Sequence, residues 1–156
     1  MKQLKAKKVD IFRINLSHTN IDQIESRILF LKKNKIKNIC IDSEGAQIRT
    51  TQCKKTFFLE ENKLIKVYNE NKLSNDKKVY IYPKFNFNFI KKNTKIFIGF
   101  NDLTLKVKRR VNEGNYLICK VFKKGFLESK KGVHISSNIK LPALTEKDIY
   151  AFKLAK

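Results

Sequence analysis

The stretch VDIFRINLSH (Val9–His18) decides how the first part of the chain folds. Apolar, β-forming residues alternate along it with polar ones, and the later polar positions hold an arginine, an amide and a hydroxyl: Arg13, Asn15 and Ser17. Alternation with a period of two is typical of a β-strand whose two faces differ. We therefore predict a strand over residues 9–17 with a polar face that begins at Arg13.

A second element with a different period follows this strand. Its apolar residues recur at helical spacing, at Ile21, Ile24, Ile28 and Leu31. Thr19 or Asn20 is available as the N-cap of this helix. The next run, KNICIDSEG, predicts a short strand over residues 38–42. Strand, helix and strand within about 35 residues form a βαβ unit, which indicates a parallel sheet.

Parallel pairing changes the interpretation of the polar face. Parallel strands are usually covered on both faces, so polar side chains on them point into a site or a barrel interior. Both predicted strands also become polar at their carboxyl ends, with Asn15-x-Ser17-His18 on one and Asp42-Ser43-Glu44 on the other. Ligands bind at that end in parallel α/β folds. The pattern leaves open that these residues only cap loops.

A β-rich region extends from Thr50 to about Glu128. Its short runs are KTFFL, KLIKVY, KVYIY, TKIFIGF, LTLKVKRRV and NYLICKVF, and turns rich in Asn, Lys and Gly separate them. We predict a compact all-β barrel or sandwich. Within FNFNF the phenylalanines alternate with asparagine, and we interpret them as one buried face of an extended segment: Phe85, Phe87 and Phe89.

The chain ends in a predicted helix. Thr145 and Asp148 match the capping pattern that opens helices, and the apolar residues Ile149, Phe152 and Leu154 follow them. A βαβ unit, a β region and a helix start, in this order, indicate an α/β framework interrupted by an inserted domain.

The composition is strongly basic. The formal net charge is +21, and the positive residues are 30 Lys but only 5 Arg, spread along the whole chain. Arginine is preferred for bidentate recognition of phosphates and bases. The charge alone therefore favours compositional drift and general solubility, and nucleic acid is not an expected partner. A few of these lysines can serve an anionic small substrate under either interpretation.

Cysteine spacing and hydropathy bear on the compartment. Three cysteines stand far apart and in no metal-ligand spacing, which indicates reduced thiols in a cytoplasmic protein: Cys40, Cys53 and Cys119. No uninterrupted apolar stretch reaches the roughly 18 residues of a membrane span. The basic N-terminus lacks the apolar run of a secretory signal. Neither membrane insertion nor secretion is expected.

Four segments, in this order, resemble pyruvate kinase. VDIFRINLSHT resembles that family's Arg-x-Asn-Phe-Ser-His strand, and ICIDSEGAQIRT resembles its Asp-Thr-Lys-Gly-Pro-Glu-Ile-Arg-Thr segment. ESKKGVHI resembles the Lys-Gly-Val-Asn-Leu stretch that leaves the family's lid domain. LPALTEKDIYAFKLA resembles the Leu-Pro-Ala-Leu-Ser-Glu-Lys-Asp segment that re-enters the barrel. Together the four segments frame nearly the whole chain.

The resemblance implies a fold and an activity. The fold is an incomplete β/α (TIM-type) barrel with an inserted small all-β barrel domain, and the expected boundaries are 1–45 for the barrel portion, 46–141 for the β lid and 142–156 for the return to the barrel. The activity is transfer of phosphate from phosphoenolpyruvate to ADP, giving pyruvate and ATP in glycolysis, with Mg²⁺ and K⁺ as cofactors. Members of this family are usually homo-oligomers.

The resemblance also implies roles for single residues. Arg13 matches the arginine that contacts the transferred phosphate. The residues that match potassium ligands are Asn15, Ser17, Asp42 and Ser43. The residues that match nucleotide contacts are Asn15, Ser17, His18, Arg49 and Lys131.

Several family features are altered or absent. Gln47 stands where a glutamate accompanies potassium dependence, which leaves the need for K⁺ open. Gly99-Phe100-Asn101 replaces an Asp-Asp-Gly turn, so carboxylates near the nucleotide's metal are expected to be missing. The family's catalytic lysine and its Mg²⁺-binding Glu and Asp have no counterpart, because no Lys-Ile-Glu or Gly-Asp-Leu-Gly run occurs.

These absences lead to an expectation about the chain by itself. A barrel of this type needs about 250 residues, so we interpret the chain as part of a pyruvate kinase, whether a fragment, a split reading frame or a remnant. No catalytic residue is assigned within it, and we expect no turnover by the chain alone. Two other hypotheses stay open: a non-catalytic relative that binds nucleotide or phosphoenolpyruvate, and a basic β-barrel module that binds nucleic acid.

Overall fold

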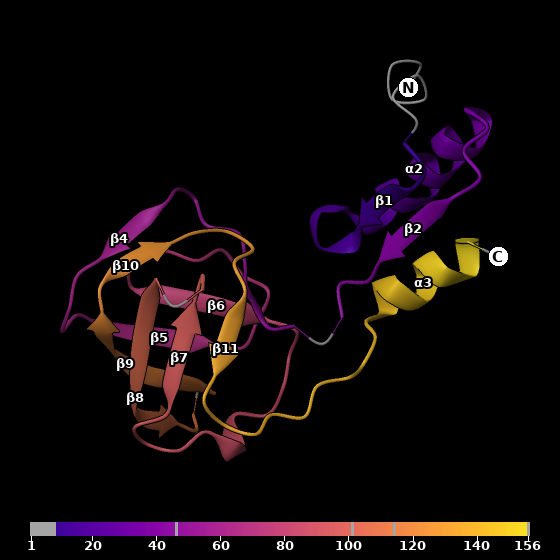
Figure 1. Ribbon diagram of the computed structural model, residues 1–156. Helices are drawn as coiled ribbons and strands as arrows, with labels where there is room; N and C mark the ends of the chain where they lie inside the picture. The colour runs from indigo at the N-terminus through magenta and orange to yellow at the C-terminus, as the bar shows by residue number, and fades with distance from the viewer. Residues whose placement is uncertain (1–8, 46, 101, 114, 156) are drawn as a thin grey trace. The chain divides into compact units, whose positions relative to one another are not determined.

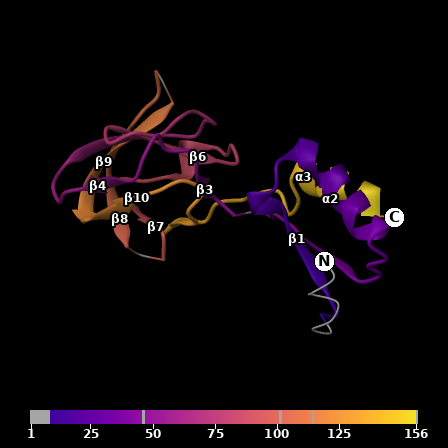
Figure 2. The same ribbon diagram turned by 90° about the horizontal axis from the view of Figure 1, so that it is seen from above.

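The computed structural model describes residues 9–45, 47–100, 102–113 and 115–155. These residues form two compact units. One unit contains residues 9–45 and 142–155, and the other contains the described residues between 47 and 141. Figures 1 and 2 show the elements of each unit from two sides. Among the described residues, no helix is long and apolar enough to cross a membrane.

The first unit is a βαβ unit with one further helix. Its elements are β1 (Phe12–Asn15), the 3₁₀ helix η1 (Leu16–His18), α2 (Ile21–Lys33), β2 (Ile39–Asp42) and α3 (Glu146–Ala155). β1 and β2 pair in parallel, and Asn15 lies opposite Asp42 in their register. α2 and α3 are in contact, and both appear on the same side of the strands in Figure 2. The predicted parallel pairing is confirmed.

The core of this unit is small. Its buried members come from β1, η1 and both helices: Ile14, Leu16, Ile24, Ile28, Leu31 and Ala151. α2 begins after Asn20, carries Asp22 in its first turn, and ends with two lysines in its last turn, charges that suit the helix dipole. Ile21, which the helical pattern also includes, is 52% exposed.

The first strand is shorter than the sequence pattern predicts. It ends at Asn15, and Leu16–His18 turn as a 3₁₀ helix. The Asn15 side chain accepts a hydrogen bond from the backbone N–H of Ser17 at 2.9 Å, and the Thr19 hydroxyl donates to the Asn15 carbonyl at 2.8 Å. Local side-chain bonds of this kind compete with strand pairing. The alternation over residues 9–17 therefore predicts a strand correctly only for Phe12–Asn15.

The second unit is built on one seven-stranded sheet. The order of its strands is β11 (Val133–Ile135), β7 (Lys95–Ile98), β8 (Leu103–Val111), β9 (Tyr116–Lys123), β5 (Leu64–Tyr68), β6 (Lys78–Tyr82) and β3 (Arg49–Thr50). Only the β5–β6 pairing is parallel among these described strands. β4 (Phe57–Leu59) and β10 (Gly125–Leu127) form a separate antiparallel pair.

The seven-stranded sheet is nearly closed into a barrel. Its two end strands meet, because Arg49 on β3 bridges Gly132 next to β11. The Val133 N–H also donates to the Ile48 carbonyl at 2.7 Å. Closure pairs backbone groups that would otherwise be exposed at the edges of the sheet, and this stabilises the sheet as a separate unit. The predicted fold class, part of an α/β barrel with an inserted all-β barrel domain, agrees with this architecture.

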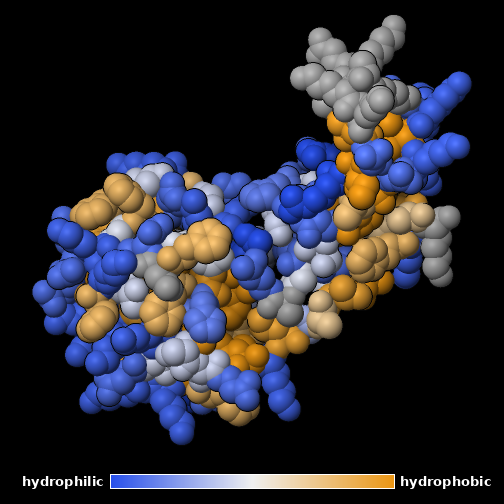
Figure 3. Space-filling view, in the orientation of Figure 1, coloured by the Kyte–Doolittle hydropathy of each residue, from blue (hydrophilic) through white to orange (hydrophobic). Residues whose placement is uncertain are grey.

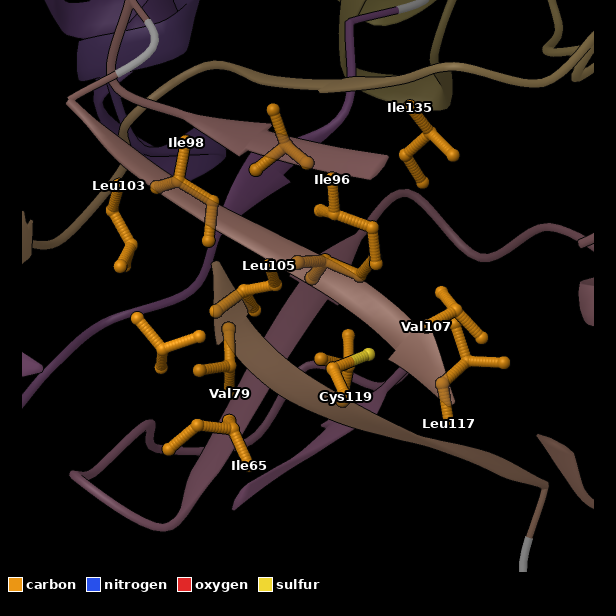
Figure 4. Packing of buried hydrophobic residues seen from close by; sticks show 14 of the residues in the cluster. Ile65, Val79, Ile96, Ile98, Leu103, Leu105, Val107, Leu117, Cys119 and Ile135 are labelled. Carbon is orange, nitrogen blue, oxygen red and sulfur yellow. The ribbon is translucent and has the colours of Figure 1, made fainter. Parts of the chain in front are cut away.

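Alternating side chains fill the inside of this barrel. Figure 4 shows apolar residues from five strands pointing toward one another, among them Ile65, Val79, Ile96, Leu105 and Cys119. All five are 0–1% exposed. The six predicted β-rich runs correspond to β4 to β9, and their inward positions are those of the period-two pattern.

The segment FNFNF does not present a single buried face. Phe87 is 1% exposed, whereas Phe89 is 64% exposed. The reason is a second 3₁₀ helix, η2 (Phe87–Phe89), opened by the Asn86 side chain, which accepts from the Asn88 N–H at 2.8 Å. The prediction of an extended segment with all three rings buried was wrong here.

Candidate functional site

Arg13 and Asp42 meet at the carboxyl end of the two parallel strands. The Nε of Arg13 donates to Oδ2 of Asp42 at 3.0 Å, and Nη2 contacts the same oxygen. The two side chains are 60% and 38% exposed, so this ion pair is accessible to solvent. Parallel register makes the contact possible, because it brings both carboxyl ends to one edge of the sheet.

Residues with side-chain oxygen atoms stand at and just after the carboxyl ends of both strands. The amide of Asn15 lies on the strand position opposite Asp42. Ser17 is buried within η1, and Ser43 follows β2 and is half-buried. Amide, hydroxyl and carboxylate oxygens are the donors that a hard cation prefers. The residue types at this edge therefore fit a potassium ion, and Ser17 belongs to the turn η1 and not to the strand.

His18 does not share this edge as a strand residue. It is the last residue of η1 and is exposed. The predicted site residues of this unit thus come from β1 and η1 and from the end of β2.

The first turn of α3 holds the residues that follow β2. The Asp148 carboxylate accepts hydrogen bonds from the backbone N–H of Glu44 at 2.6 Å, of Gly45 at 3.1 Å and of Thr145 at 2.8 Å. The Asp148 N–H in turn donates to the Thr145 hydroxyl at 3.2 Å. The predicted capping pair is therefore present. Its aspartate also stabilises the turn after Ser43, because it accepts hydrogen bonds from the backbone there.

The environment of Asp148 lowers the pKa of its carboxyl group. Burial by itself raises this pKa, but the hydrogen bonds from Thr145, Glu44 and Gly45 stabilise the charged form and outweigh it. Asp148 is 0% exposed, whereas Ile149 is 46% and Phe152 is 38% exposed. The helix was predicted correctly, but its buried positions were not. The capping pattern and the family segment Leu-Pro-Ala-Leu-Ser-Glu-Lys-Asp both mark Asp148, but neither indicates its contacts with Glu44 and Gly45.

Lys147 connects the ends of both strands. Its Nζ forms an ion pair with Glu44, and these side chains are only 22% and 9% exposed. The same Nζ lies 3.4 Å from the carbonyl oxygen of Thr19, just after η1. The family pattern has lysine at the position of Glu44, so this chain has an ion pair that the pattern does not provide.

Arg49 and Lys131 lie close together in the β unit. Arg49 donates from Nη1 to the Lys130 carbonyl at 3.0 Å and from Nη2 to Oε1 of Gln47 at 2.6 Å. Its Nε is buried and has no hydrogen-bond partner among the described residues. The backbone N–H of Lys131 donates to the Thr50 hydroxyl at 2.9 Å, next to Arg49.

The side chain of Lys131 lies beside the turn that replaces the family's Asp-Asp-Gly. Its Nζ pairs with Glu128 at 2.9 Å. A Cβ added to Gly99 would lie 4.0 Å from the Lys131 side chain and 3.8 Å from Oδ2 of Asp102. The carboxylate of Asp102, which follows the three altered positions, therefore lies beside this turn. Asn101 and Ala46 lie outside the described residues.

The predicted site residues thus fall into two groups. Those in the first unit are Arg13, Asn15, Ser17, His18, Asp42 and Ser43, and those in the β unit are Arg49 and Lys131. In the first unit, contacts join Arg13 to Asp42 and Asn15 to Ser17, whereas His18 stands apart at the end of η1.

Comparison with known proteins assigns the family. The family model described as pyruvate kinase, barrel domain, matches residues 1–155. The chain belongs to the pyruvate kinase family. Pyruvate kinases are enzymes, and the predicted resemblance is confirmed.

Individual pyruvate kinases support the same assignment. The chain is 30% identical over 148 residues to pyruvate kinase of Lactobacillus delbrueckii subsp. bulgaricus, covering 89% of this chain and 25% of that protein. It is 33% identical over 144 residues to pyruvate kinase of Clostridium acetobutylicum, covering 87% and 30%. It is 27% identical over 153 residues to that of Thermotoga maritima, covering 94% and 32%.

A solved structure confirms the fold. The crystal structure of Cryptosporidium parvum pyruvate kinase matches with a TM-score of 0.83 at 18% sequence identity, covering 96% of this chain and 32% of that one. The chain therefore spans about a quarter to a third of the length of the pyruvate kinases that it matches.

Proposed function

We propose that this chain supplies the phosphate- and cation-binding part of a pyruvate kinase that transfers phosphate from phosphoenolpyruvate to ADP and yields pyruvate and ATP. The observation that carries the proposal is the Arg13–Asp42 ion pair opposite Asn15, at the carboxyl edge of two parallel strands. Phosphoryl transfer depends mainly on positioning and on cationic groups around the moving phosphate. An exposed guanidinium at this edge meets that requirement.

Each residue has a specific part in this proposal. Arg13 donates its planar fork of N–H groups to the phosphate of phosphoenolpyruvate, and the neighbouring carboxylate of Asp42 keeps that fork oriented. A potassium ion held here would add positive charge for the same phosphate, and its ligands are Asn15, Ser17, Asp42 and Ser43. The nucleotide contacts are Asn15, Ser17, His18, Arg49 and Lys131. Residues 46–141 then act as the lid domain between the barrel segments 1–45 and 142–156.

Chemistry on the substrate needs residues that this chain does not contain. The sequence has no counterpart of the family's catalytic lysine or of the carboxylates that hold Mg²⁺. We expect no pyruvate from the chain alone with phosphoenolpyruvate, ADP, Mg²⁺ and K⁺, measured as lactate formation in a coupled assay. Lactate above the blank would show that the chain carries a complete site.

Binding of phosphoenolpyruvate tests the proposal directly. Titration of the chain into phosphoenolpyruvate, followed by the ³¹P resonance of its phosphate, should broaden or shift that resonance. Arg13→Gln should abolish the effect, because it removes the charged guanidinium and leaves a shorter, neutral polar side chain. Lys32→Gln on α2 removes the same charge from the same unit and should leave the titration unchanged. Equal titrations for both variants would reject Arg13 as the phosphate ligand.

A further inference from the structure

The outer face of the seven-stranded sheet is basic to an unusual degree. Among the described residues, none of the nine strands of the β unit contains an aspartate or glutamate, although several carry lysine. The ion pairs that the described part of this unit forms hold other lysines: Lys63, Lys72 and Lys131. Figure 3 shows hydrophilic side chains over much of the visible surface of the unit. The acidic residues of the described β unit thus lie between the strands and not on them.

Register lines up several of these lysines across neighbouring strands. Lys95 on β7 lies opposite Lys106 on β8, and Lys106 lies opposite Lys120 on β9. On the same sheet Lys66 on β5 lies opposite Lys78 on β6. Like charges directly opposite one another destabilise a sheet. A row of three lysines across three strands is therefore unfavourable by itself, and an anionic partner would relieve the repulsion.

Aromatic rings lie among these lysines. Phe122 is 54% exposed, and the Nζ atoms of Lys95 and Lys106 lie 4.9 and 5.9 Å from the centre of its ring. Lys66 lies 5.1 Å from the ring centre of Tyr116. Cation–π contacts of this kind keep the lysines beside the rings.

Two further groups of rings come from strands of the same sheet, and one of them includes the buried Tyr80. Phe97 stacks on His134 with ring centres 5.9 Å apart. Tyr68 packs between Tyr80 and Tyr116, with both ring centres 5.0 Å away. On β5, β6 and β7 a lysine is thus followed two residues later by an aromatic residue.

We propose that this outer face binds single-stranded nucleic acid. Its contact residues are Lys66, Lys95, Lys106, Lys120, Phe122 and Tyr116. Proteins that bind single strands combine a cationic track for the phosphates with aromatic rings on which bases stack. Both components occur here on one sheet, and the lysine rows cross the strands at the regular spacing of about 4.8 Å. An anionic partner without bases would use the lysines but would have nothing to stack on the aromatic rings beside them.

The sequence alone leads to a different expectation because it does not show cross-strand register. The lysines look evenly spread along the chain, and the run FNFNF draws attention to Phe85 and Phe87. Phe87 is buried and Phe85 packs against the core, so neither offers a ring to a base. The inference rests on the β unit alone and is independent of phosphoenolpyruvate binding.

Fluorescence anisotropy with a labelled 16-nucleotide oligo(dT) tests the proposal. We expect binding at low salt whose affinity falls steeply as salt rises, because bound phosphates release counterions. The double variant K106Q/K120Q should weaken binding by about tenfold and lower the slope of log affinity against log salt by roughly 1.4, because each phosphate neutralised on a single strand contributes about 0.7. The matched control K32Q/K33Q removes equal charge from α2 and should change affinity less than about twofold, since α2 makes no contact with the strand under this proposal.

The rings are tested separately from the charges. Phe122→Ala should weaken binding by about tenfold, which is within the range for loss of one stacked base. Phe89→Ala removes a ring of similar exposure from η2 and should have no effect. Thermal unfolding of each variant, followed by circular dichroism, verifies that the sheet is intact.

Three results would overturn the proposal. The first is absence of binding at low salt. The second is equal loss of affinity in K106Q/K120Q and K32Q/K33Q. The third is unchanged binding in Phe122→Ala together with equally strong competition by inorganic polyphosphate, which would show a surface for anions in general.

Discussion

The two units of this molecule differ in how far each is complete. The β unit closes on itself, because Arg49 at one end of its sheet bridges Gly132 beside the other end. The first unit has two parallel strands and leaves large apolar side chains exposed, with Ile11 at 63%, Leu29 at 54% and Phe30 at 55%. Figure 3 shows hydrophobic side chains on the visible side of this unit. Parallel sheets are normally covered on both faces. The exposed apolar side chains of the first unit are therefore of the kind that further strands or helices cover in a larger sheet.

The difference separates stability from function. The β unit contains most of the buried apolar residues of the described chain. The first unit contains the exposed ion pair and the oxygen donors of the candidate site. We therefore expect substitutions in the core of the β unit to have the largest effect on stability. Substitutions of the site's polar residues in the first unit should instead change ligand binding.

The largest effect is expected from Leu105→Ala in the barrel core. Leu105 is 0% exposed, and truncating a buried leucine costs about 2–5 kcal/mol. Burial raises the pKa of the Cys119 thiol to about 12, so this group reacts with a thiol reagent only when the unit opens. Labelling of Cys119 with Ellman's reagent should accelerate strongly in the variant, whereas labelling of the exposed Cys40 should not change. Equal acceleration at both cysteines would show that the units unfold together.

A smaller effect, confined to the first unit, is expected from Asp148→Asn. The amide keeps the size of the side chain but replaces one acceptor oxygen by a donor, so a buried backbone N–H loses its partner. The cost is about 1–3 kcal/mol. Urea unfolding followed at the helical circular dichroism signal should shift to lower urea, while tyrosine fluorescence should not, because four of the five tyrosines lie in the β unit. Glu146→Gln, at an exposed position of the same turn, is the control.

The same carboxylate makes the first unit sensitive to acid. The folded-state pKa of Asp148 lies below its ordinary value of 3.8, so the unfolded chain binds more protons in the interval between them. Its stabilisation is fully present above about pH 3.8 and is lost as the pH falls below that value. The difference in unfolding midpoint between wild type and Asp148→Asn should narrow over this range. A constant difference down to about pH 2.5 would contradict the pKa shift.

The smallest effect on stability is expected from Arg13→Gln. The ion pair with Asp42 is exposed at both ends, and exposed pairs contribute about 0–1 kcal/mol. Thermal unfolding of the variant should therefore match wild type closely, although its response to phosphoenolpyruvate is lost. A large decrease in stability would show that Arg13 is a structural residue of the first unit.

The elements were easier to predict from the sequence than their ends. Strands β5 to β9 have enough alternating residues to be recognised, whereas β3, β10 and β11 have only two or three residues and give no period. The turn at Ser17 was missed because Asn15 bonds to the backbone two residues on, a contact that alternation does not encode.

Contacts between distant residues were not predictable in the same way. The buried position of Asp148 depends on Glu44 and Gly45, more than a hundred residues earlier. The rows of lysines depend on strand register. Arg13 and Asp42 are an intermediate example, because parallel pairing predicted a shared edge but not the hydrogen bond. Family resemblance named the residues of the candidate site, and the structure supplied their partners.

The hydrogen bonds from Glu44 and Gly45 to Asp148 have a consequence for the order of folding. They span 104 and 103 positions of the chain, and the whole β unit lies between the two partners. Contacts so distant in sequence raise the contact order and form slowly. During synthesis the β unit leaves the ribosome complete before Asp148 appears, and domains fold as they emerge. The turn at Glu44 and Gly45, although it is translated before the β unit, therefore reaches its final structure after the β unit has folded.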